Sequence, residues 1–307
     1  MARLDPAHRR TFPIVDPHQH FWDLENNYYP WLCDPAPVAF RYGDYSALKR
    51  SYLPPDYRGD TAAFRIVKTV HVEAEWDRAD PVGETRWLEK IRQTFDLPSA
   101  CVGHAAPDRP DVGEVLAGHA QSALVRGIRH KPSAARDPRE ARRGERGSMD
   151  DPRWRAGFAL LERFGLSYDL QTPWWHLDAA AALAADFPRT QIIINHTGLP
   201  ADRSAEALAA WRRALELAAA QPNVALKISG LGRPGLPWSV EANAPIIRDA
   251  IAIFGAERAM FASNYPVDRL AGSFEAIYDG FFAAVAERPA EELRQLFHDN
   301  AVRIYRL

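Results

Sequence analysis

The stretch Gln191-Ile192-Ile193-Ile194-Asn195-His196 indicates the fold most directly, because its apolar residues occupy consecutive positions. A strand with one face in water alternates apolar and polar residues, whereas a strand of a parallel sheet is covered on both faces and is apolar throughout. Similar short runs recur along the whole chain. We expect eight strands, at residues 12–16, 66–73, 99–106, 124–130, 166–171, 191–196, 224–229 and 258–263.

Longer amphipathic or alanine-rich segments separate these strands, as in repeated βα units. Several begin beside Asp or Ser and end near Pro or Gly, which cap and terminate helices. The expected helices are residues 80–95, 111–121, 152–164, 177–187, 205–220, 240–254 and 273–286, with further helices in 290–307. This order, without a sequence repeat or low-complexity linker, predicts one α/β domain over residues 1–307, a closed (β/α)8 TIM barrel.

Two connections are unusually long, and both follow the carboxyl ends of strands, where barrel active sites are built. Residues 21–60, after the first strand, are rich in Tyr, Trp and Pro, and residues 131–150, after the fourth, are highly charged. We expect the aromatic segment to cover the pocket. For residues 136–146, a binding loop and a solvated surface loop are both open.

Composition narrows the class of protein. The 307 residues are 47% hydrophobic and 25% charged, which suffices for a large core, and the net charge of -2 provides no field to gather nucleic acid or anionic lipid. Cys33 and Cys101 are too few for a disulfide framework, and no apolar run reaches the roughly 20 residues that span a bilayer. We therefore expect a cytoplasmic protein with a small-molecule substrate and no membrane or nucleic-acid partner.

The sharpest chemical signal is Asp16-Pro17-His18-Gln19-His20, at the end of the first strand. Side chains two apart on a strand point the same way, so His18 and His20 can converge above the barrel mouth. An isolated pair of this kind is often structural. His196 ends the sixth strand, however, and a closed barrel brings it to the same mouth, which favours a functional cluster of three histidines.

The last strand ends in Ser263-Asn264-Tyr265-Pro266. With the histidine pair and His196, this turn resembles the amidohydrolase-2 branch of the amidohydrolase superfamily. The most similar subgroup contains sugar-acid lactonases, of the L-fuconolactonase and L-rhamnonolactonase type, and 2-pyrone-4,6-dicarboxylate lactonase. The resemblance covers nearly the whole chain, including Val72-Glu73-Ala74, Gly127-Ile128-Arg129, Lys227-Ile228-Ser229-Gly230, Asp299-Asn300-Ala301 and Tyr305.

The resemblance implies a hydrolase that opens a lactone, with one departure. Its members usually carry Asp where this chain has Asn264, and that carboxylate holds or activates the attacking water. An amide cannot take the proton at neutral pH. Asp268 is the nearest replacement, and Glu73 and Asp16 are further candidates. Asp268 could instead cap the helix that begins after Gly272.

A metal is the next expectation. Neutral imidazoles suit Zn²⁺ or a similar divalent ion, which would polarise a lactone carbonyl or activate bound water, and His18, His20 and His196 are the candidate ligands. Against this, Asn264 replaces the usual carboxylate ligand, and the resemblance includes members that work without metal. Both a single-ion site and a metal-free site therefore stay open.

The substrate expected from the resemblance is an anionic or polyhydroxy lactone. Arg129 and Lys227 occupy strand positions where a charge is costly unless it points into the mouth, and Arg is the usual bidentate partner of a carboxylate. His130 is a further candidate ligand. Trp174 is expected either to wall the pocket or to pack between a helix and the barrel.

Two other functions compete with the lactonase. The same branch contains metal-dependent decarboxylases of unsaturated or aromatic acids, and Asn264 counts against this reading because those enzymes use an Asp ligand there. The other is a non-catalytic ligand-binding barrel, which three convergent histidines disfavour. The sequence is also compatible with a homo-oligomer.

Overall fold

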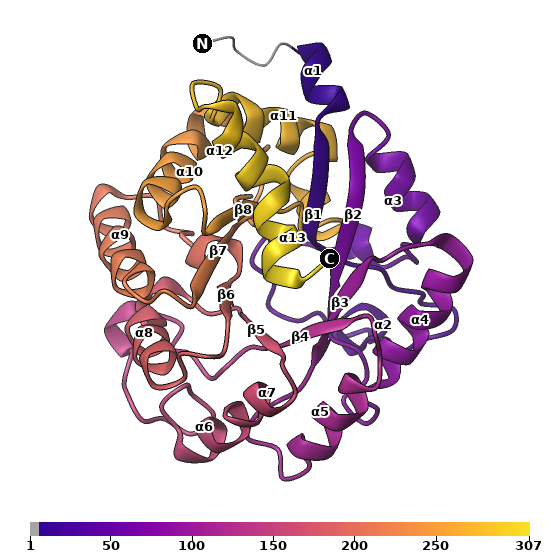
Figure 1. Cartoon of the computed structure of the whole chain (residues 1–307), viewed down its shortest axis with the longest axis vertical. Helices are drawn as coiled ribbons and strands as arrows, with labels where there is room; N and C mark the ends of the chain where they lie inside the picture. The colour runs from indigo at the N-terminus through magenta and orange to yellow at the C-terminus, as the bar shows by residue number, and fades with distance from the viewer. Residues whose placement is uncertain (1–5) are drawn as a thin grey trace.

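A computed structural model describes residues 6–307 and contains eight parallel strands paired in sequence order (Figure 1). The eight expected strands are confirmed, with ends that differ by a few residues. They are β1 Pro13–Gln19, β2 Arg65–Val72, β3 Ala100–His104, β4 Val125–His130, β5 Ser167–Leu170, β6 Ile192–Ile194, β7 Val224–Ile228 and β8 Ala259–Phe261.

The barrel closes where the end of β1 meets the segment after β8. Gln19 and Tyr265 form a parallel bridge, and the His20 amide donates to the Tyr265 carbonyl at 2.8 Å. The Asn264 amide donates to the His18 carbonyl at 2.7 Å. These bonds bring two sequence motifs more than 240 residues apart into direct contact at the mouth.

Helices surround the strands in the order that the sequence predicts (Figure 1). They are α4 Gly83–Phe95, α5 Val112–Ala120, α6 Pro152–Phe158, α7 Leu160–Arg163, α8 Leu177–Asp186, α9 Ala205–Ala219, α10 Val240–Phe254, α11 Phe274–Ala284, α12 Ala290–Arg294 and α13 Asn300–Tyr305. The expected helix over residues 152–164 is thus divided into α6 and α7. Three short helices were not expected: α1 Pro6–Thr11, α2 Pro30–Cys33 and α3 Pro54–Asp60. Among the described helices, none has the length and apolar character required to cross a bilayer.

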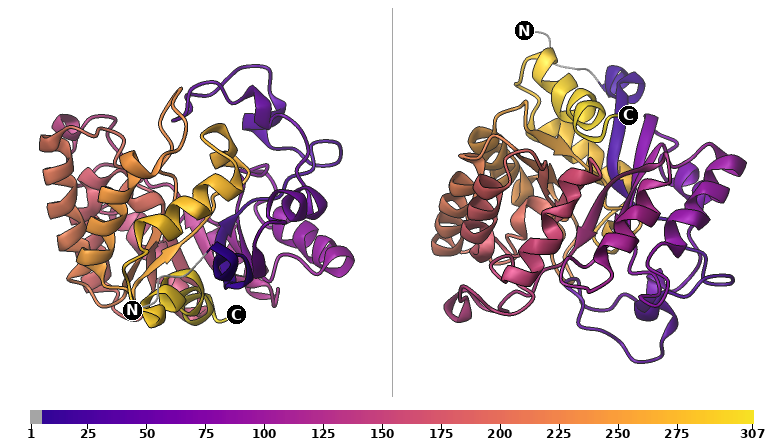
Figure 2. Two further views of the ribbon diagram at one scale, coloured as in Figure 1. Left: turned by 90° about the horizontal axis from the view of Figure 1, so that it is seen from above. Right: turned by 60° about the horizontal axis from the view of Figure 1, so that its bottom comes forward.

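The inside of the barrel is filled by apolar side chains from six strands. They pack against Ala301, Ile304 and Tyr305, so α13 covers one end of the barrel; the strand residues are Val15, Val70, Val72, Ala100, Val102, Ile193, Ala225 and Met260. Figure 2 shows α13 on one side of the barrel and the long segment after β1 on the other. The interior is therefore a packed core, and the end away from α13 is the one at which barrel active sites are built.

The segment between β1 and α3 is held by its aromatic rings. Trp31 stacks on Phe40 with ring centroids 5.7 Å apart, and Trp22 packs edge-on against Trp31 at 5.7 Å. All three rings line the pocket at the carboxyl ends of the strands, called here the main pocket, which confirms that this segment covers it. Residues 136–146 are mostly exposed, with Arg139 paired to neighbouring Asp137, so the surface-loop interpretation is the one that holds.

Candidate active site

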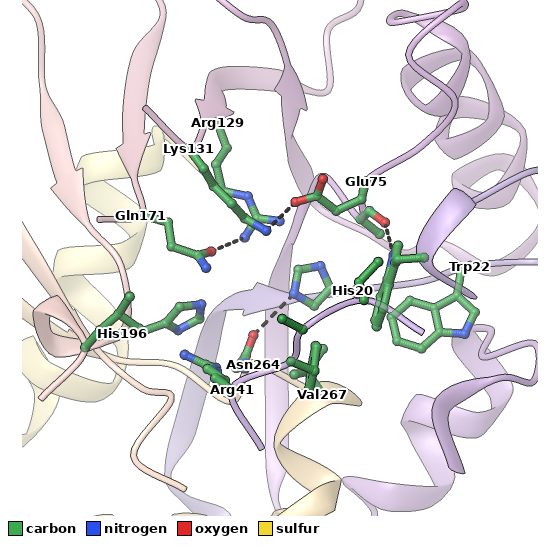
Figure 3. Close-up of a pocket in the computed structure, with 16 residues that line it drawn as sticks. His20, Trp22, Arg41, Glu75, Arg129, Lys131, Gln171, His196, Asn264 and Val267 are labelled. Atoms are coloured by element: carbon green, nitrogen blue, oxygen red, sulfur yellow. Dashed lines mark hydrogen bonds and ion pairs between the residues drawn. The ribbon is translucent and has the colours of Figure 1, made fainter. Parts of the chain in front are cut away.

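A cavity of about 460 Å³ opens at the carboxyl ends of the strands. Figure 3 shows His20, His196 and Asn264 at its polar side, with Arg41 beside them. Trp22, Trp31, Phe40, Val38, Leu199 and Val267 supply much of the remaining wall. The pocket thus combines a few polar groups with an apolar surface, which is the usual composition of a small-molecule site.

The three predicted histidines do converge. His18 lies on β1, His20 follows that strand, and His196 follows β6. The ring centroid of His18 is 5.0 Å from that of His20 and 4.6 Å from that of His196. The β1–β2 register shifts between Asp16 and Gln19, which locally changes the direction of the strand and aims the pair at the mouth. The cluster is confirmed, and its catalytic role stays a prediction.

Backbone contacts fix the orientation of His20. Its Nδ1 lies 2.7 Å from the carbonyl oxygen of Val72, which can only accept a hydrogen bond, so Nδ1 carries the proton. In neutral His20 the other nitrogen, Nε2, is therefore an acceptor. It faces Oδ1 of Asn264 at 3.3 Å.

Asp268 fixes the orientation of Asn264. The Asn264 Nδ2 group donates to Asp268 Oδ1 at 2.6 Å, so Oδ1 of Asn264 must point towards His20. Asp268 also accepts from the Tyr42 hydroxyl at 2.8 Å and the Gly230 amide at 3.1 Å. With Arg41 as a fourth donor at 3.4 Å, this carboxylate is fully occupied and does not reach the pocket.

The alternative role of Asp268 as a helix cap is wrong, because Ser273 caps α11 through the Ala276 amide. Burial raises the pKa of Asp268, and Arg41 and the donors around it lower this pKa in part. The paired carboxylate is thus a support for Asn264.

His196 is held by a left-handed turn. Its φ is 54°, that of Thr197 is 58°, and its Nδ1 lies 3.0 Å from the Ser229 hydroxyl. Gly230 has a φ of +65°, and a Cβ there would lie 2.7 Å from the Cβ of His196. Glycine is therefore required for the His196 ring to reach the pocket.

The surroundings of all three rings favour the neutral form. Burial is the largest cause that lowers the pKa of His18, His20 and His196 well below the ordinary value. Cations add to this effect: Lys227 beside His18, Arg129 beside His20 and Arg41 beside His196. Neutral imidazoles can accept or donate single protons, which suits acid–base chemistry.

The other carboxylate candidates are engaged elsewhere. Glu73 Oε1 accepts from Arg129 Nε at 2.8 Å, and its Oε2 lies 3.4 Å from Arg78. Asp16 accepts from the Ser263 hydroxyl at 2.6 Å and the Tyr57 hydroxyl at 2.8 Å. Neither Glu73 nor Asp16 lines the main pocket.

The predicted substrate ligands separate into two groups. Arg129 lines the main pocket and donates to Gln171 Oε1 at 3.3 Å. Lys227 is fully buried below His18, and His130 lies in a neighbouring hollow of about 330 Å³. Trp174 is absent from the lining of the main pocket and packs against Trp175 and the core, which favours its packing role.

Two residues near the site were missed. Arg41 comes from the long aromatic segment, where no periodic pattern marks it. Asp169 is a fully buried charge in the middle of β5, and a charge inside an apolar strand is a signal that could have identified it.

Of the two possibilities that the sequence leaves open, the arrangement of the described residues fits the metal-free site better. Within residues 6–307, no three His, Cys, Asp or Glu side chains are placed to share one ion. Nδ1 of His18 accepts from the Lys227 ammonium, Nδ1 of His20 is bound to a carbonyl, and the fourth neighbour, Asn264, is a neutral amide. A cation bound to His18 would also lie close to Lys227, so the arrangement does not fit a divalent ion.

Comparisons with known proteins agree with the fold and the motifs. A family model described as Amidohydrolase matches residues 15–307. The uncharacterized protein y4mH of Sinorhizobium fredii is 44% identical over 96% of this chain and 98% of its own length. An L-fucono-1,5-lactonase of Burkholderia multivorans is 30% identical over 95% of this chain and 96% of its own.

A solved amidohydrolase from Burkholderia multivorans, with bound zinc, has a TM-score of 0.78 and 27% identity, over 96% of this chain and all of its own. Solved decarboxylases lie below 25% identity and share the fold alone.

Proposed function

Since this chain belongs to the amidohydrolase family, we propose that it hydrolyses the cyclic ester of a small lactone. The observation that carries the proposal is a pair of facing acceptors, His20 Nε2 and Asn264 Oδ1, 3.3 Å apart at the pocket. Two acceptors held face to face by their other partners need a donor that reaches both of them from the pocket side. A water molecule would satisfy both, and it would be held in place to attack.

His20 acts as the base in this reaction. Water donates to His20 Nε2 and Asn264 Oδ1, its oxygen attacks the lactone carbonyl carbon, and its proton passes to His20. Asn264 cannot take the proton, so it orients the water. The role usually played by one aspartate is divided between an imidazole and an amide.

The carbonyl oxygen gains negative charge and needs donors. Nε2 of His18 is buried without a protein partner, and the neighbouring ring of His196, 4.6 Å away, lines the pocket. If the Ser229 hydroxyl donates to Nδ1 of His196, this ring also presents an N–H at Nε2. Collapse of the adduct breaks the ring C–O bond, and the proton on His20 moves to the leaving oxygen, which gives a hydroxy acid.

The charges at the pocket wall favour an anionic or oxygen-rich substrate. Arg41, Arg129 and Lys131 line the cavity, and Glu75, beside Lys131, is its one carboxylate among the described residues. The L-fucono-1,5-lactonase relatives support a lactone as the substrate class.

The test is a panel of sugar-acid and dicarboxylate lactones followed by proton release. We expect hydrolysis by the parent protein and a loss of about 10² to 10⁴ in kcat for His20→Gln, which removes the base. His298→Gln is the control, because His298 pairs with Asp299 and does not line the pocket. Failure on every lactone, together with CO₂ release from a panel of aromatic acids, would replace the lactonase by a decarboxylase.

A further inference from the structure

Three polar side chains contact one another in the buried interior below the histidines. Lys227 on β7, Asp169 on β5 and Tyr305 on α13 are each fully buried. Lys227 Nζ lies 2.5 Å from Asp169 Oδ1, and the Tyr305 hydroxyl donates to the two Asp169 oxygens at 2.9 and 3.0 Å. Asn195 Nδ2 donates to Asp169 at 2.9 Å, so the carboxylate is surrounded by donors.

The upper end of this chain of contacts is His18. Lys227 Nζ lies 3.4 Å from Nδ1 of His18. An ammonium group can only donate, so Nδ1 must be the unprotonated nitrogen, and a neutral ring then carries its proton on Nε2. Nε2 is the atom of His18 that is buried without a partner.

A second set of contacts fixes the position of Lys227. Its Nζ lies 4.9 Å from the centre of the Tyr305 ring, a distance at which the ring attracts a cation. Tyr305 therefore contacts both members of the ion pair, through its hydroxyl and its ring. Because Lys227 is fully buried and absent from the pocket lining, it has no access to a substrate.

We infer that Tyr305, Asp169 and Lys227 are positioning residues that hold neutral His18 with its proton on Nε2, directly beneath the pocket residue His196, whose ring centroid is 4.6 Å away. This inference rests on the proposed hydrolysis only for its kinetic consequence. The last turn of the chain, at the closed end of the barrel, thereby contributes to the orientation of a group at the open end.

The protonation pattern has a consequence for metal binding. A histidine ligand offers an unprotonated nitrogen to the ion. In His18 the unprotonated nitrogen is turned towards a lysine, and the nitrogen without a protein partner carries the proton. Lys227 thus favours the form of His18 that carries its proton on Nε2 over the form whose unprotonated Nε2 could bind a metal ion.

The test combines NMR with kinetics on the full chain. In protein labelled with ¹⁵N-histidine, the His18 signals, assigned by their loss in His18→Gln, should show a one-bond N–H coupling at Nε2 and none at Nδ1. In Lys227→Met the Nδ1-protonated form should appear. The kinetic expectation for this variant is a fall of about 10- to 100-fold in kcat, the usual cost of losing such a support, with KM within about twofold.

Tyr305→Phe serves if Lys227→Met does not fold, because it keeps the ion pair. We expect a decrease of about fivefold in kcat, the effect of one hydrogen bond, and detectable Nδ1 protonation of His18. Tyr278→Phe is the matched control: Tyr278 is equally buried, but its hydroxyl has no partner, so kcat and the His18 signals should not change.

Protonation of Nδ1 in the parent protein would overturn the inference, and so would unchanged His18 signals in both Lys227→Met and Tyr305→Phe. If no lactone is hydrolysed, the proposed function fails, whereas the NMR results still decide whether Lys227 controls His18.

Discussion

The polar groups on the two sides of the barrel mouth differ in whether their hydrogen-bonding atoms already have partners. The histidine side consists of His18, His20, His196 and Asn264. Its rings are neutral, one ring nitrogen is buried without a partner, and two acceptors face one another. These are the atoms that a substrate and a water molecule would satisfy.

On the carboxylate side, by contrast, the charged groups are paired with one another. It consists of Glu73, Glu75, Arg78, Arg129 and Lys131. Glu73 is bound by two arginines, and Glu75 pairs with Arg78 and Lys131. Burial by itself raises the pKa of Glu73, but Arg129 and Arg78 outweigh burial and hold this pKa well below its usual value.

Buried charge and chemical reactivity therefore lie on different sides of this mouth. Glu73 is a poor base, because the two arginines that it neutralises occupy its lone pairs. Its position in the sequence nevertheless suggests a catalytic role. Neutral groups with unsatisfied atoms are better placed to react. Variants on the two sides should therefore change different measured quantities.

The largest effect is expected from Glu73→Gln. This change leaves Arg129 buried without its counter-charge, which costs about 3–5 kcal/mol in the free energy of unfolding. Denaturant titration measures the loss. Glu75→Gln is the matched control, because the Glu75 side chain is 30% exposed and should cost about 0–1 kcal/mol. Equal losses in the two variants would remove the distinction between buried and exposed pairs.

The Glu73 effect should depend on pH in one direction. Its pKa is lowered in the folded protein, so the folded state binds fewer protons than the unfolded state near the usual value of 4.5. The stability difference between the parent protein and Glu73→Gln should be complete above pH 4.5 and decrease as the pH falls below it. A difference that increases on acidification would show that the folded pKa is raised.

Next in size is His196→Gln on the histidine side. Loss of one donor to a developing oxyanion reduces kcat by about 10² to 10³. The free energy of unfolding should change little, since the ring makes one side-chain hydrogen bond, to Ser229. Stopped-flow or indicator assays measure kcat, and thermal unfolding provides the control. A folded His196→Gln protein with full activity contradicts the mechanism.

A smaller effect is expected from Asp268→Asn. Asp268 does not line the pocket, and it supports Asn264 through a 2.6 Å hydrogen bond. Replacing the carboxylate by an amide weakens this bond and lets the Asn264 side chain rotate, so we expect a decrease of about tenfold in kcat. If Asp268 were itself the base, the loss would match that of His20→Gln.

The fold was predictable because most of its strands can be recognised from short local stretches of sequence. Most strands contain a short apolar run, and even the three-residue strand β6 stands out as three isoleucines. The short helices α2 and α3 were not found, because four to seven residues beginning with Pro show no helical period. Their positions depend on packing of the aromatic segment against the barrel.

The site was predictable where residues follow strand ends. His18, His20, His196, Asn264 and Arg129 belong to this class, since barrel closure alone brings them together. Lys227 illustrates the limit. A charge in a strand can point towards the mouth or towards a buried partner, and its partner Asp169 lies 58 residues away in sequence. The direction of the Lys227 side chain is set by packing inside the barrel, which the sequence pattern does not show.

The smallest effect is expected from metal removal. Lys227 turns the unprotonated nitrogen of His18 inward, and Asn264 offers no charge, so the histidine side lacks the donor set of a divalent site. Dialysis against a strong chelator should leave kcat and KM unchanged, with less than one zinc per chain by mass spectrometry.

The matched variant is Asn264→Asp, which adds a carboxylate next to His20. This variant should bind zinc more tightly than the parent protein, because carboxylate is a ligand that zinc accepts. Loss of parent activity on chelation, with recovery on adding zinc, would mean that the histidine side is completed by an ion and that His18 is not held as a donor.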